Sequence, residues 1–377
     1  MLSFLSKTAT ASPVCSSFIK STIPSVTRTL AMASPGNEPL KASNLFDVSN
    51  YSAIVTGGGS GIGLMITQSL VANGAKVYIT GRRKEALDTV VQKHSSRPGQ
   101  VIALPGDVTH KDEILRLVKE VESKEPNGIH LLVNNAGIAR DDNTKYSNGA
   151  PDFESAQSIS EHLWKSDPEA WGSTFETNVT SQFFVSAGFL PLLSKSRTAS
   201  YTPSIINIAS ISGVMKGSSN GQFAYAASKA AFLHLTRMQA TTFLKAKIRV
   251  NCIAPGVFPS EMTTGKSDEN QKSSIESEAS NPSGRYGEEN DMAACALFLA
   301  GPAGTFLNGQ VIYPDGGKYL PYLTFSGVPL TDLFYRQYSG VSSVYLKRRS
   351  GNAYCLGSCE IFSTSSVFSS LWEKGIS

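Results

Sequence analysis

Tyr225 and Lys229 have the types and spacing of a proton-transferring pair, because they stand four residues apart at the start of a segment with helical spacing. Residues four apart lie on one face of a helix, so the ammonium can sit near the phenol. A free tyrosine titrates near pH ~10, and a neighbouring cation should lower its pKa toward the range of a general acid or base. An exposed helix pair has the same spacing, but a strand candidate ending at Ser210 lies just upstream. We therefore expect Tyr225 to donate or accept a proton.

A glycine-rich turn lies earlier in the chain, where Thr56-Gly-Gly-Gly-Ser-Gly-Ile-Gly63 joins a short apolar run to a segment with helical spacing. Gly57, Gly61 and Gly63 permit a tight turn, a close approach to a pyrophosphate and close packing of a helix on a strand. The helix N-terminus then offers free N–H groups to phosphates. Other tight turns also collect glycine, but this one lies in the first strand–helix–strand unit, which favours a dinucleotide site.

The next apolar run ends in Tyr78-Ile-Thr-Gly-Arg-Arg83. A site that prefers NAD carries an acid at this point, which accepts hydrogen bonds from the ribose hydroxyls. Here Arg82 and Arg83 follow instead, and arginine suits the 2′-phosphate of NADP by its charge and its donor fork. The alternative is that both arginines belong to a surface loop. The pattern favours NADP as the cofactor.

The chain around these motifs alternates short apolar runs with helix-length segments. Strands are expected at residues 52–56, 76–80, 100–104, 130–134, 204–209 and 248–254, and helices at residues 62–73, 84–93, 112–123, 168–193, 224–244 and 291–299. Strands flanked by helices indicate a parallel sheet that is buried on both faces. The prediction is an α/β fold with a doubly wound parallel sheet, which is a Rossmann fold in a single domain.

Four segments depart from this pattern. Residues 140–165 are polar and are expected as an insertion over the carboxyl edge of the sheet, and residues 259–289 as a substrate lid. Residues 1–45 are basic and rich in Ser and Thr, which predicts either a mitochondrial transit peptide or a disordered extension, and hence a cytoplasmic or mitochondrial location. Residues 321–377 have no fold signal and form an extension of unknown structure after a catalytic domain at residues 46–320.

Together the motifs resemble those of the short-chain dehydrogenase/reductase family, and in particular its fungal-type members that are similar to 3-oxoacyl-carrier-protein reductases. The resemblance covers about three quarters of the chain. It rests on Thr56–Gly63, Asp107-Val108, Asn134-Asn-Ala-Gly137, Asn178, Ser210, the Tyr225/Lys229 pair, Pro255-Gly256, Asn308-Gly-Gln and Asp315-Gly-Gly317. It implies a homodimer or homotetramer.

The resemblance also implies roles for single residues. The catalytic set would be Ser210, which hydrogen-bonds the substrate oxygen, Tyr225, which passes the proton, Lys229, which holds the nicotinamide ribose, and Asn178, which anchors a water. Asp107 would contact the adenine side. The cofactor set comprises Tyr225 and Lys229 together with Thr56, Gly57, Ser60, Gly61, Ile62, Gly63, Arg82, Arg83, Asp107, Asn134, Ala136, Gly137, Pro255, Gly256, Val257 and Ser260.

The chain departs from the family pattern at the serine. Ser212 has the family's usual distance from Tyr225, whereas Ser210 has the usual position in the motif. We prefer Ser210 and interpret residues 217–222 as a short insertion. The family's chains normally end soon after the Asp-Gly-Gly turn, so residues 321–377 have no counterpart.

Composition excludes several other classes of function. The formal net charge is +4, with acids and bases interspersed, so no nucleic-acid site is expected. The longest apolar run, residues 293–300, is far shorter than the ~18–20 residues of a membrane span. The five cysteines have no metal-ligand spacing, so no metal is expected.

These patterns predict an oxidoreductase that transfers a hydride between NADP(H) and a ketone/secondary alcohol pair. A β-keto acyl or polyketide-type secondary-metabolite substrate is suggested, and sugar alcohols stay open. The alternative is a non-catalytic NADP-binding sensor or scaffold with the same fold. Such proteins usually lose the Tyr or the Lys of the pair, and this chain has both.

Overall fold

The strands at the centre of the molecule are apolar along their length, and both faces of their sheet are therefore buried. All five residues of Ser52–Thr56 (β1) are buried. Successive side chains of a strand point to opposite faces; Ala53 and Val55 join one apolar cluster, whereas Ile54 joins another. Strands of this kind need helices on both sides, as in parallel α/β sheets.

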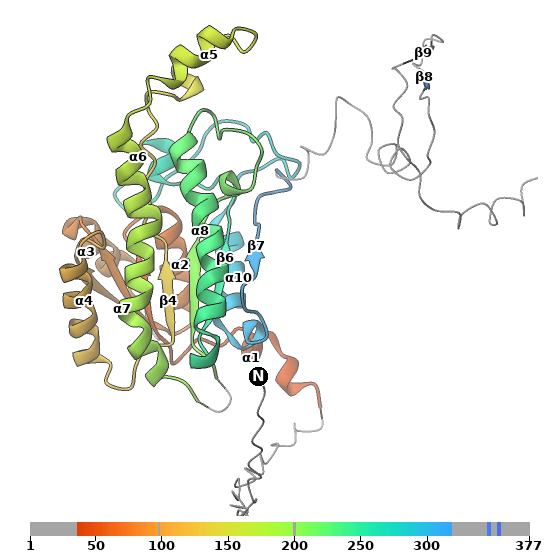
Figure 1. Cartoon of the computed structure of the whole chain (residues 1–377). Coiled ribbons are helices and arrows are strands. Elements are labelled where there is room, and N and C mark those ends of the chain that lie inside the picture. The colour runs from red at the N-terminus through yellow and green to blue at the C-terminus, as the bar shows by residue number, and fades with distance from the viewer. Residues whose placement is uncertain (1–35, 97–98, 199–200, 319–344, 348–352, 356–377) are drawn as a thin grey trace, which may run out of the picture. The chain divides into compact units, whose positions relative to one another are not determined.

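The computed structural model describes residues 36–96, 99–198, 201–318, 345–347 and 353–355 (Figure 1). Its contacts divide the chain into two units, Met1–Lys41 and Ala42–Ser377. The described part of the first unit is a short stretch with one 3-10 turn at Glu38–Leu40. The second unit holds the sheet and its helices.

The sheet has seven parallel strands in the order β3-β2-β1-β4-β5-β6-β7. After β1 the strands are β2 (Lys76–Gly81), β3 (Gln100–Pro105), β4 (Leu131–Asn134), β5 (Ser204–Ile208), β6 (Arg249–Ile253) and β7 (Val311–Ile312). The chain winds outward from β1 in one direction and from β4 in the other. The predicted α/β fold, a doubly wound parallel sheet of the Rossmann type in a single domain, is confirmed. The two-residue strand β7 was not predicted, because so short a segment shows no period.

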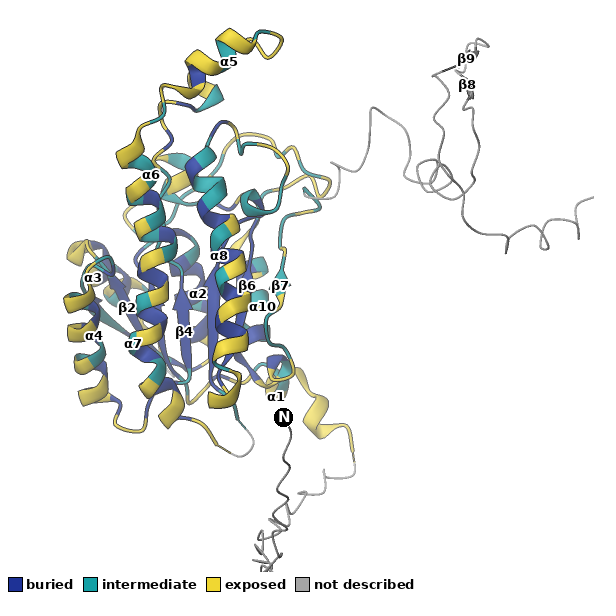
Figure 2. Ribbon diagram, viewed as in Figure 1, coloured by how far each residue is buried: buried dark blue, intermediate teal, exposed yellow. Residues whose placement is uncertain are grey.

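Helices form a layer on each face of the sheet (Figure 1). One layer comprises α2 (Gly61–Ala72), α3 (Lys84–His94) and α10 (Glu289–Ala300). The other comprises α4 (Lys111–Lys124), α7 (Ser181–Lys195) and α8 (Phe223–Thr242). Figure 2 shows the strands buried between helices whose outer faces are exposed. Every strand end is thereby held at a fixed place relative to the helices that follow it.

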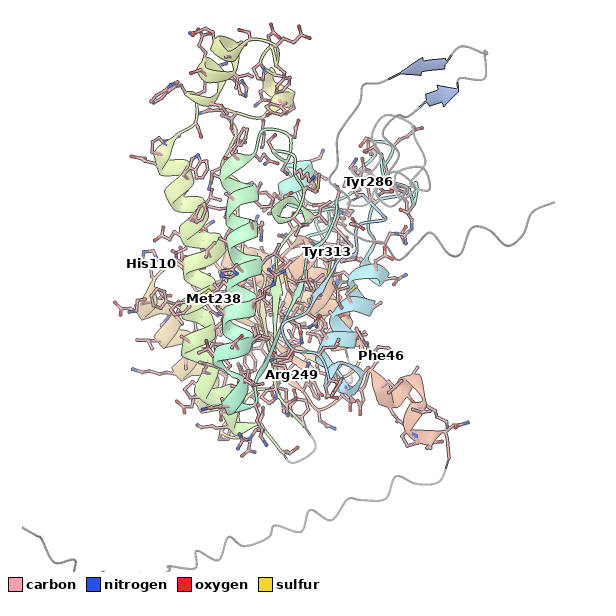
Figure 3. The ribbon with its side chains drawn as sticks, turned by 45° about the vertical axis from the view of Figure 1, so that its right-hand side comes forward. Phe46, His110, Met238, Arg249, Tyr286 and Tyr313 are labelled. Atoms are coloured by element: carbon pink, nitrogen blue, oxygen red, sulfur yellow. The ribbon has the colours of Figure 1, made fainter. Side chains whose placement is uncertain are left out.

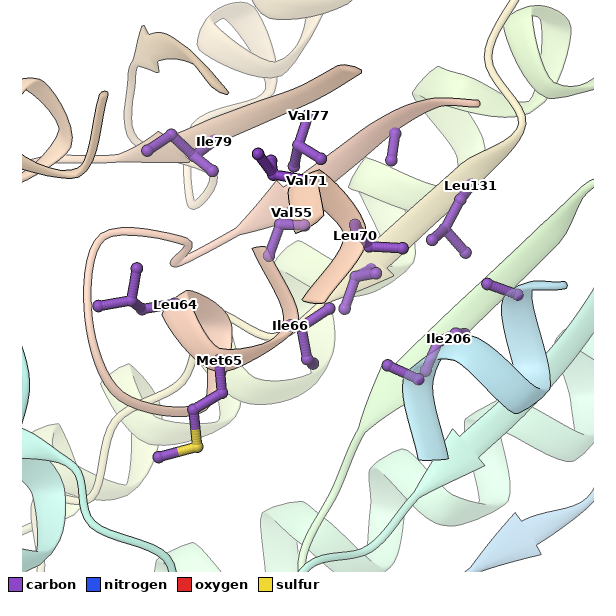
Figure 4. Close-up of a cluster of buried hydrophobic side chains, with 14 of the residues drawn as sticks. Val55, Leu64, Met65, Ile66, Leu70, Val71, Val77, Ile79, Leu131 and Ile206 are labelled. Carbon is purple, nitrogen blue, oxygen red and sulfur yellow. The ribbon is translucent and has the colours of Figure 1, made fainter. Parts of the chain in front are cut away.

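The helix α2 after the glycine turn is anchored by its apolar side chains. Leu64, Ile66 and Leu70 are at most 1% exposed and pack in the same cluster as Val55 of β1 and Ile206 of β5 (Figure 4). Burial of such side chains stabilises the fold by roughly 1.5–3 kcal/mol each. The packing holds the N-terminus of α2 at the carboxyl end of β1.

Residues 168–193, expected as one helix, form two helices with a π-helical turn between them. The helix α6 (Pro168–Phe175) is followed by the turn at Glu176–Thr180 and then by α7. The side chain of Asn178 in this turn bonds to the backbone of Ile138 on a neighbouring segment. Turns of this type often mark functional sites, and periodicity alone does not reveal them.

Of the two segments expected to be irregular, residues 140–165 contain a helix that was missed. This is α5 (Ala156–Leu163), which begins where Ser155 caps the N–H of Ser158. Its eight residues are mostly polar, so no apolar stripe predicted it. Residues 259–289 contain the short helix α9 (Glu261–Thr264) and, at their last position, the start of α10, and otherwise no regular helix or strand. One further short helix, α1 (Ala42–Leu45), precedes β1.

The two ends of the sheet have different neighbours. Figure 3 shows Arg249, the first residue of β6, at the amino ends of the strands and Tyr286, from residues 259–289, beyond their carboxyl ends. No helix in the described part of the chain has the length and apolar character to cross a membrane. The predictions for residues 1–45 and 321–377 lie almost wholly outside the described residues. Within the second segment, β8 (Tyr345–Lys347) pairs antiparallel with β9 (Ala353–Cys355).

Candidate active site

A cleft of about 390 Å³ lies at the carboxyl edge of the sheet, where the strand order changes direction between β1 and β4. Ligands of doubly wound folds bind at this switch point. Its walls come from the glycine turn before α2, the ends of β2, β3 and β4, the start of α8 and the short helix α9. Segments far apart in the sequence therefore meet around one cavity.

The glycine turn has the backbone geometry that its sequence predicted. Gly57 and Gly61 have positive φ angles of 64° and 53°, which favour glycine. A Cβ atom on Gly63 would lie 2.2 Å from the carbonyl oxygen of Gly57, so only glycine fits there. The hydroxyl of Thr56 accepts hydrogen bonds from the N–H groups of Asn135 (2.9 Å) and Ala136 (3.0 Å). The turn is thus tied to the end of β4, and the residues present fit a dinucleotide.

The structure brings most of the predicted residues to this cleft. Those that line it are Gly57, Ser60, Gly61, Ile62, Arg82, Arg83, Asp107, Ala136, Gly137, Tyr225, Lys229 and Ser260. Eight other predicted residues are not among the described residues that line the cleft: Thr56, Gly63, Asn134, Asn178, Ser210, Pro255, Gly256 and Val257.

The buried position of Asn134 explains its place outside the cleft. Its amide nitrogen donates to the hydroxyl of Ser186 (2.8 Å) and to the side-chain oxygen of Asn207 (2.9 Å). The residue is 0% exposed. It connects β4 to β5 and α7, but it does not line the cleft. Its neighbour Asn135, which was not predicted, lines the cleft instead.

Tyr225 lines the cleft, and Ser210 lies beside it. The hydroxyl of Ser210 lies close enough to the phenol of Tyr225 to favour its ionised form. Burial raises the pKa of Tyr225, and Ser210 offsets only part of that rise. The expectation that a neighbouring cation lowers this pKa is therefore wrong for this structure, because the loss of water around the phenolate outweighs the other effects. The phenol stays protonated and can act as a proton donor.

Lys229 lies behind Tyr225 and is itself buried, with 4% exposure. Its Nζ atom is 5.7 Å from the centroid of the Tyr225 ring and donates to the carbonyl oxygen of Ile208 at 2.9 Å. Burial lowers the pKa of Lys229 to about 8, because the charged form loses its water. The pair thus shares one helix face, as its spacing predicted.

The two candidate serines differ in their contacts. The hydroxyl of Ser212 bonds to that of Ser219 at 2.8 Å, on the loop before α8. Ser210 faces Tyr225 instead. Ser219 and Asn220 both have positive φ angles, so this loop is strained at two non-glycine positions. The distance along the chain pointed to Ser212, but the geometry places Ser210 at the phenol.

Asn178 holds the π-helical turn in place beside the cleft. Its Oδ1 atom accepts from the N–H of Ile138, and its Nδ2 atom donates to the carbonyl of Ile138, each at 2.8 Å. Nδ2 also donates to the hydroxyl of Ser228 at 3.0 Å. The described contacts of this side chain are therefore with protein groups of α8 and of the segment after β4.

Charged residues gather at the opposite end of the cleft. The guanidinium of Arg83 donates to both carboxylate oxygens of Glu261, at 3.0 and 2.7 Å. Burial works to raise the pKa of Asp107, but bonds from Thr109 and the charge of Arg82 lower it below its ordinary value. The carboxylate of Asp107 is thus ionised near Arg82.

Comparisons with known proteins agree with this geometry. Residues 57–318 match the family model described as "Enoyl-(Acyl carrier protein) reductase". The short-chain dehydrogenase/reductase PhomF′ of Diaporthe leptostromiformis is 42% identical over 293 residues, which is 76% of this chain and 97% of that protein. The chain belongs to the short-chain dehydrogenase/reductase family. It is therefore an oxidoreductase of that family.

Two further relatives of this short-chain dehydrogenase/reductase come from Pseudomonas aeruginosa. The rhamnolipids biosynthesis 3-oxoacyl-[acyl-carrier-protein] reductase is 37% identical over 277 residues, which is 73% of this chain and 98% of that protein. The solved structure "RhlG/NADP active-site complex" superposes with a TM-score of 0.62 at 34% identity, covering 73% of this chain and 99% of that chain.

Sequence reasoning missed Asp141, which holds the start of α8 in this short-chain dehydrogenase/reductase. Its two carboxylate oxygens accept from the N–H groups of Ala224 (3.0 Å) and Tyr225 (2.9 Å). The side chain is buried, with 4% exposure. The first N–H groups of a helix have no partner within the helix, and a carboxylate there is stabilising. An acid shortly after the Asn134–Gly137 motif was a visible signal, but its partners lie more than eighty residues away.

We expect Asp141→Asn to lower kcat by about tenfold or more, since small displacements of a reacting group are costly. An amide NH2 group would face one of the two N–H donors, so the free energy of unfolding should fall by about 1–3 kcal/mol. Steady-state kinetics, cofactor affinity and urea unfolding measure these effects, and cofactor affinity should change little.

Asp142→Asn is the matched control for Asp141→Asn. Asp142 is the next residue, is 67% exposed at its side chain and pairs with Lys145 on the surface. It should keep wild-type kcat and stability, because exposed ion pairs contribute little. Equal behaviour of the two variants would contradict the role of Asp141 as a positioning residue.

Proposed function

We propose that this protein is an NADP(H)-dependent oxidoreductase that interconverts a ketone and a secondary alcohol. One observation carries the proposal: a single cleft has Arg82 and Arg83 at one end and Tyr225 and Lys229 at the other. A cofactor with an additional phosphate at one end and a reactive ring at the other matches this distribution of charge and acid–base groups. The retained Tyr225/Lys229 pair favours catalysis over a sensor or scaffold role.

The side chains at the reacting end have complementary roles in reduction. When bound, NADPH supplies a hydride to the carbonyl carbon. Tyr225 donates its phenolic proton to the carbonyl oxygen, which completes the alcohol, and the phenolate regains a proton from solvent. Ser210 holds the carbonyl oxygen next to the phenol, to which its own hydroxyl lies close. Lys229, at its place behind the phenol, binds the ribose and stabilises the phenolate.

Asn178 supports this arrangement from the side. It connects the π-helical turn to Ile138 after β4 and to Ser228 of α8, and so fixes the helix that carries Tyr225. We propose that the turn anchors a water of the proton relay. Asp107 contacts the adenine side, where it lines the cleft together with Arg82.

The proposed substrates are β-keto acyl or polyketide-type secondary-metabolite ketones. The names of one relative and of the family model support this class, since the relative is a 3-oxoacyl-[acyl-carrier-protein] reductase and the family model carries an acyl-carrier-protein name. Met262, which lines the cleft, is an exposed apolar side chain suited to an apolar substrate. A homodimer or homotetramer and a cytoplasmic or mitochondrial location stay predictions.

The preference for NADP is tested by Arg82→Asp combined with Arg83→Ala. A charge-assisted hydrogen bond to a phosphate contributes ~1.5–3 kcal/mol, so the loss of one bond lowers affinity roughly tenfold to a hundredfold. An aspartate at this place also repels the phosphate, while it can accept from the ribose hydroxyls of NAD. The kcat/KM for NADPH divided by that for NADH, measured with one ketone, should therefore fall roughly tenfold to a hundredfold.

Lys84→Ala serves as the control for this double change. Lys84 follows the two arginines and pairs with Asp88 in the first turn of α3. Its removal should leave the NADPH/NADH ratio unchanged. A wild-type preference for NADH, or a ratio that the double change does not move, would show that Arg82 and Arg83 are surface charges.

A further inference from the structure

The side chain of Arg83 is already engaged by an acid across the cleft. Its Nη1 and Nη2 atoms donate to Oε1 and Oε2 of Glu261, at 3.0 and 2.7 Å. Arg83 follows the end of β2, and Glu261 is the first residue of α9, so the pair spans the cleft from one wall to the other. Both residues line the cavity in which Tyr225 and Lys229 lie.

The carboxylate of Glu261 is held at this position by more than Arg83. Its Oε1 atom accepts from the hydroxyl of Ser267 at 2.7 Å. Ser260 and Thr263 form a capping box that fixes the start of α9. Arg83 lowers the pKa of Glu261, and so does the bond from Ser267, so the carboxylate stays ionised at neutral pH. A fixed negative charge thus faces the guanidinium.

A guanidinium binds a carboxylate or a phosphate through the same two-pronged donor edge. In this geometry Glu261 occupies that edge of Arg83, and a 2′-phosphate that approached it would meet the carboxylate as a like charge. The other cations near Arg83 do not neutralise Glu261, because each has an acid of its own. Lys84 pairs with Asp88, and Arg82 lies near the ionised Asp107. An acid in the cleft therefore opposes the group that the arginines are expected to bind.

We propose that Glu261 is a specificity-determining residue that competes with the 2′-phosphate for Arg83 and so weakens the preference for NADP(H) over NAD(H). The inference rests on the proposed function of Arg82 and Arg83. Arg83 must exchange a carboxylate for a phosphate when the cofactor binds, whereas a ligand without the 2′-phosphate leaves the pair intact. The effect is moderate, because the side chains of Arg83 and Glu261 are 59% and 28% exposed and solvent screens the pair.

The test uses calorimetric binding of two small probes, adenosine 2′,5′-bisphosphate and adenosine 5′-monophosphate, to the full chain. Glu261→Gln should bind the bisphosphate about three- to tenfold more tightly than wild type does, because the freed guanidinium has no competing anion. Affinity for the monophosphate should stay within about twofold, since that probe lacks the competing phosphate. The NADPH/NADH affinity ratio should rise by the same factor as the ratio for the two probes.

Two further variants distinguish competition for Arg83 from a general effect of removing a negative charge. In an Arg83→Met background, Glu261→Gln should improve bisphosphate binding less than it does with Arg83 present, because the shared partner is gone. Glu276→Gln removes the same charge from an exposed position in the 259–289 segment and should change neither affinity. A change in monophosphate affinity caused by Glu261→Gln would instead indicate a disturbed α9 and would count against the proposal.

The outcomes distinguish this inference from the cofactor proposal on which it rests. A wild-type preference for the bisphosphate that Glu261→Gln does not increase overturns the inference alone. No preference in either protein overturns both the inference and the assignment of NADP. If wild type shows no preference for the bisphosphate but Glu261→Gln does, the competition is supported, and Glu261 masks Arg83 in the native chain.

Discussion

Tyr225→Phe should lower kcat for ketone reduction by about 10²–10⁴-fold, which is the usual contribution of a general acid. The change removes only the hydroxyl that lies near Ser210, and the ring keeps its place on α8. NADPH should still bind with near wild-type affinity, because the phosphate-binding turn and the arginines are untouched. The readouts are single-turnover kinetics with saturating NADPH and fluorescence titration of the cofactor.

Tyr201→Phe is the matched control for the loss of a phenolic hydroxyl. Tyr201 donates to the carbonyl of His130 at the amino end of β4, whereas the cleft lies at the carboxyl ends of the strands. This variant should keep kcat. If Tyr225→Phe retained more than about a tenth of the wild-type rate, the assignment of the proton donor would be wrong.

Arg249→Met should lower the free energy of unfolding by about 3 kcal/mol, because it leaves buried carbonyl groups without a donor. Arg249 begins β6 and is 5% exposed. Its Nη1 atom donates to the carbonyls of Leu299 (3.1 Å) and Gly304 (2.8 Å), and its Nε atom donates to the hydroxyl of Thr202 (3.1 Å). Leu299 lies in the last turn of α10, where carbonyls lack partners within the helix and a cation is favourable.

Urea unfolding at neutral pH measures this loss, and Arg197→Met is its control. Arg197 is exposed and makes one long bond of 3.4 Å to the carbonyl of Ala246, so its removal should cost less than about 0.5 kcal/mol. Cofactor affinity should be unchanged in both variants, since Arg249 lies at the opposite end of the strands from the cleft (Figure 3). Equal stabilities of the two variants would contradict the role of Arg249 in securing α10.

Local patterns in the sequence predicted the strands and helices because the apolar residues of each element show which of its faces is buried. Apolar runs such as β1 have to be covered on both faces. The glycines at positions 57 and 61 adopt positive φ angles that other residues disfavour. The spacing of Tyr225 and Lys229 likewise depends on the helix alone. These features are local, so they could be predicted without knowledge of any partner.

Contacts between distant segments were decided only by the tertiary structure. The acid that holds α8 is Asp141, the acid that engages Arg83 is Glu261, and neither choice follows from local spacing. Motif position and chain distance disagreed about Ser210 and Ser212, and the packing of the loop before α8 turns Ser212 toward Ser219.

The pKa of Tyr225 shows most directly what local sequence could predict and what required the tertiary structure. Sequence spacing brought a cation to one face of the helix and predicted a lowered pKa, but it carried no information about how much water the phenol loses on folding. In the folded chain burial dominates and raises the pKa. The sequence by itself therefore determined the sheet, the glycine turn and the placement of Tyr225 and Lys229 on one helix face. The fold decided the electrostatics of that pair and the residues that position it, because both depend on packing between segments that are far apart along the chain.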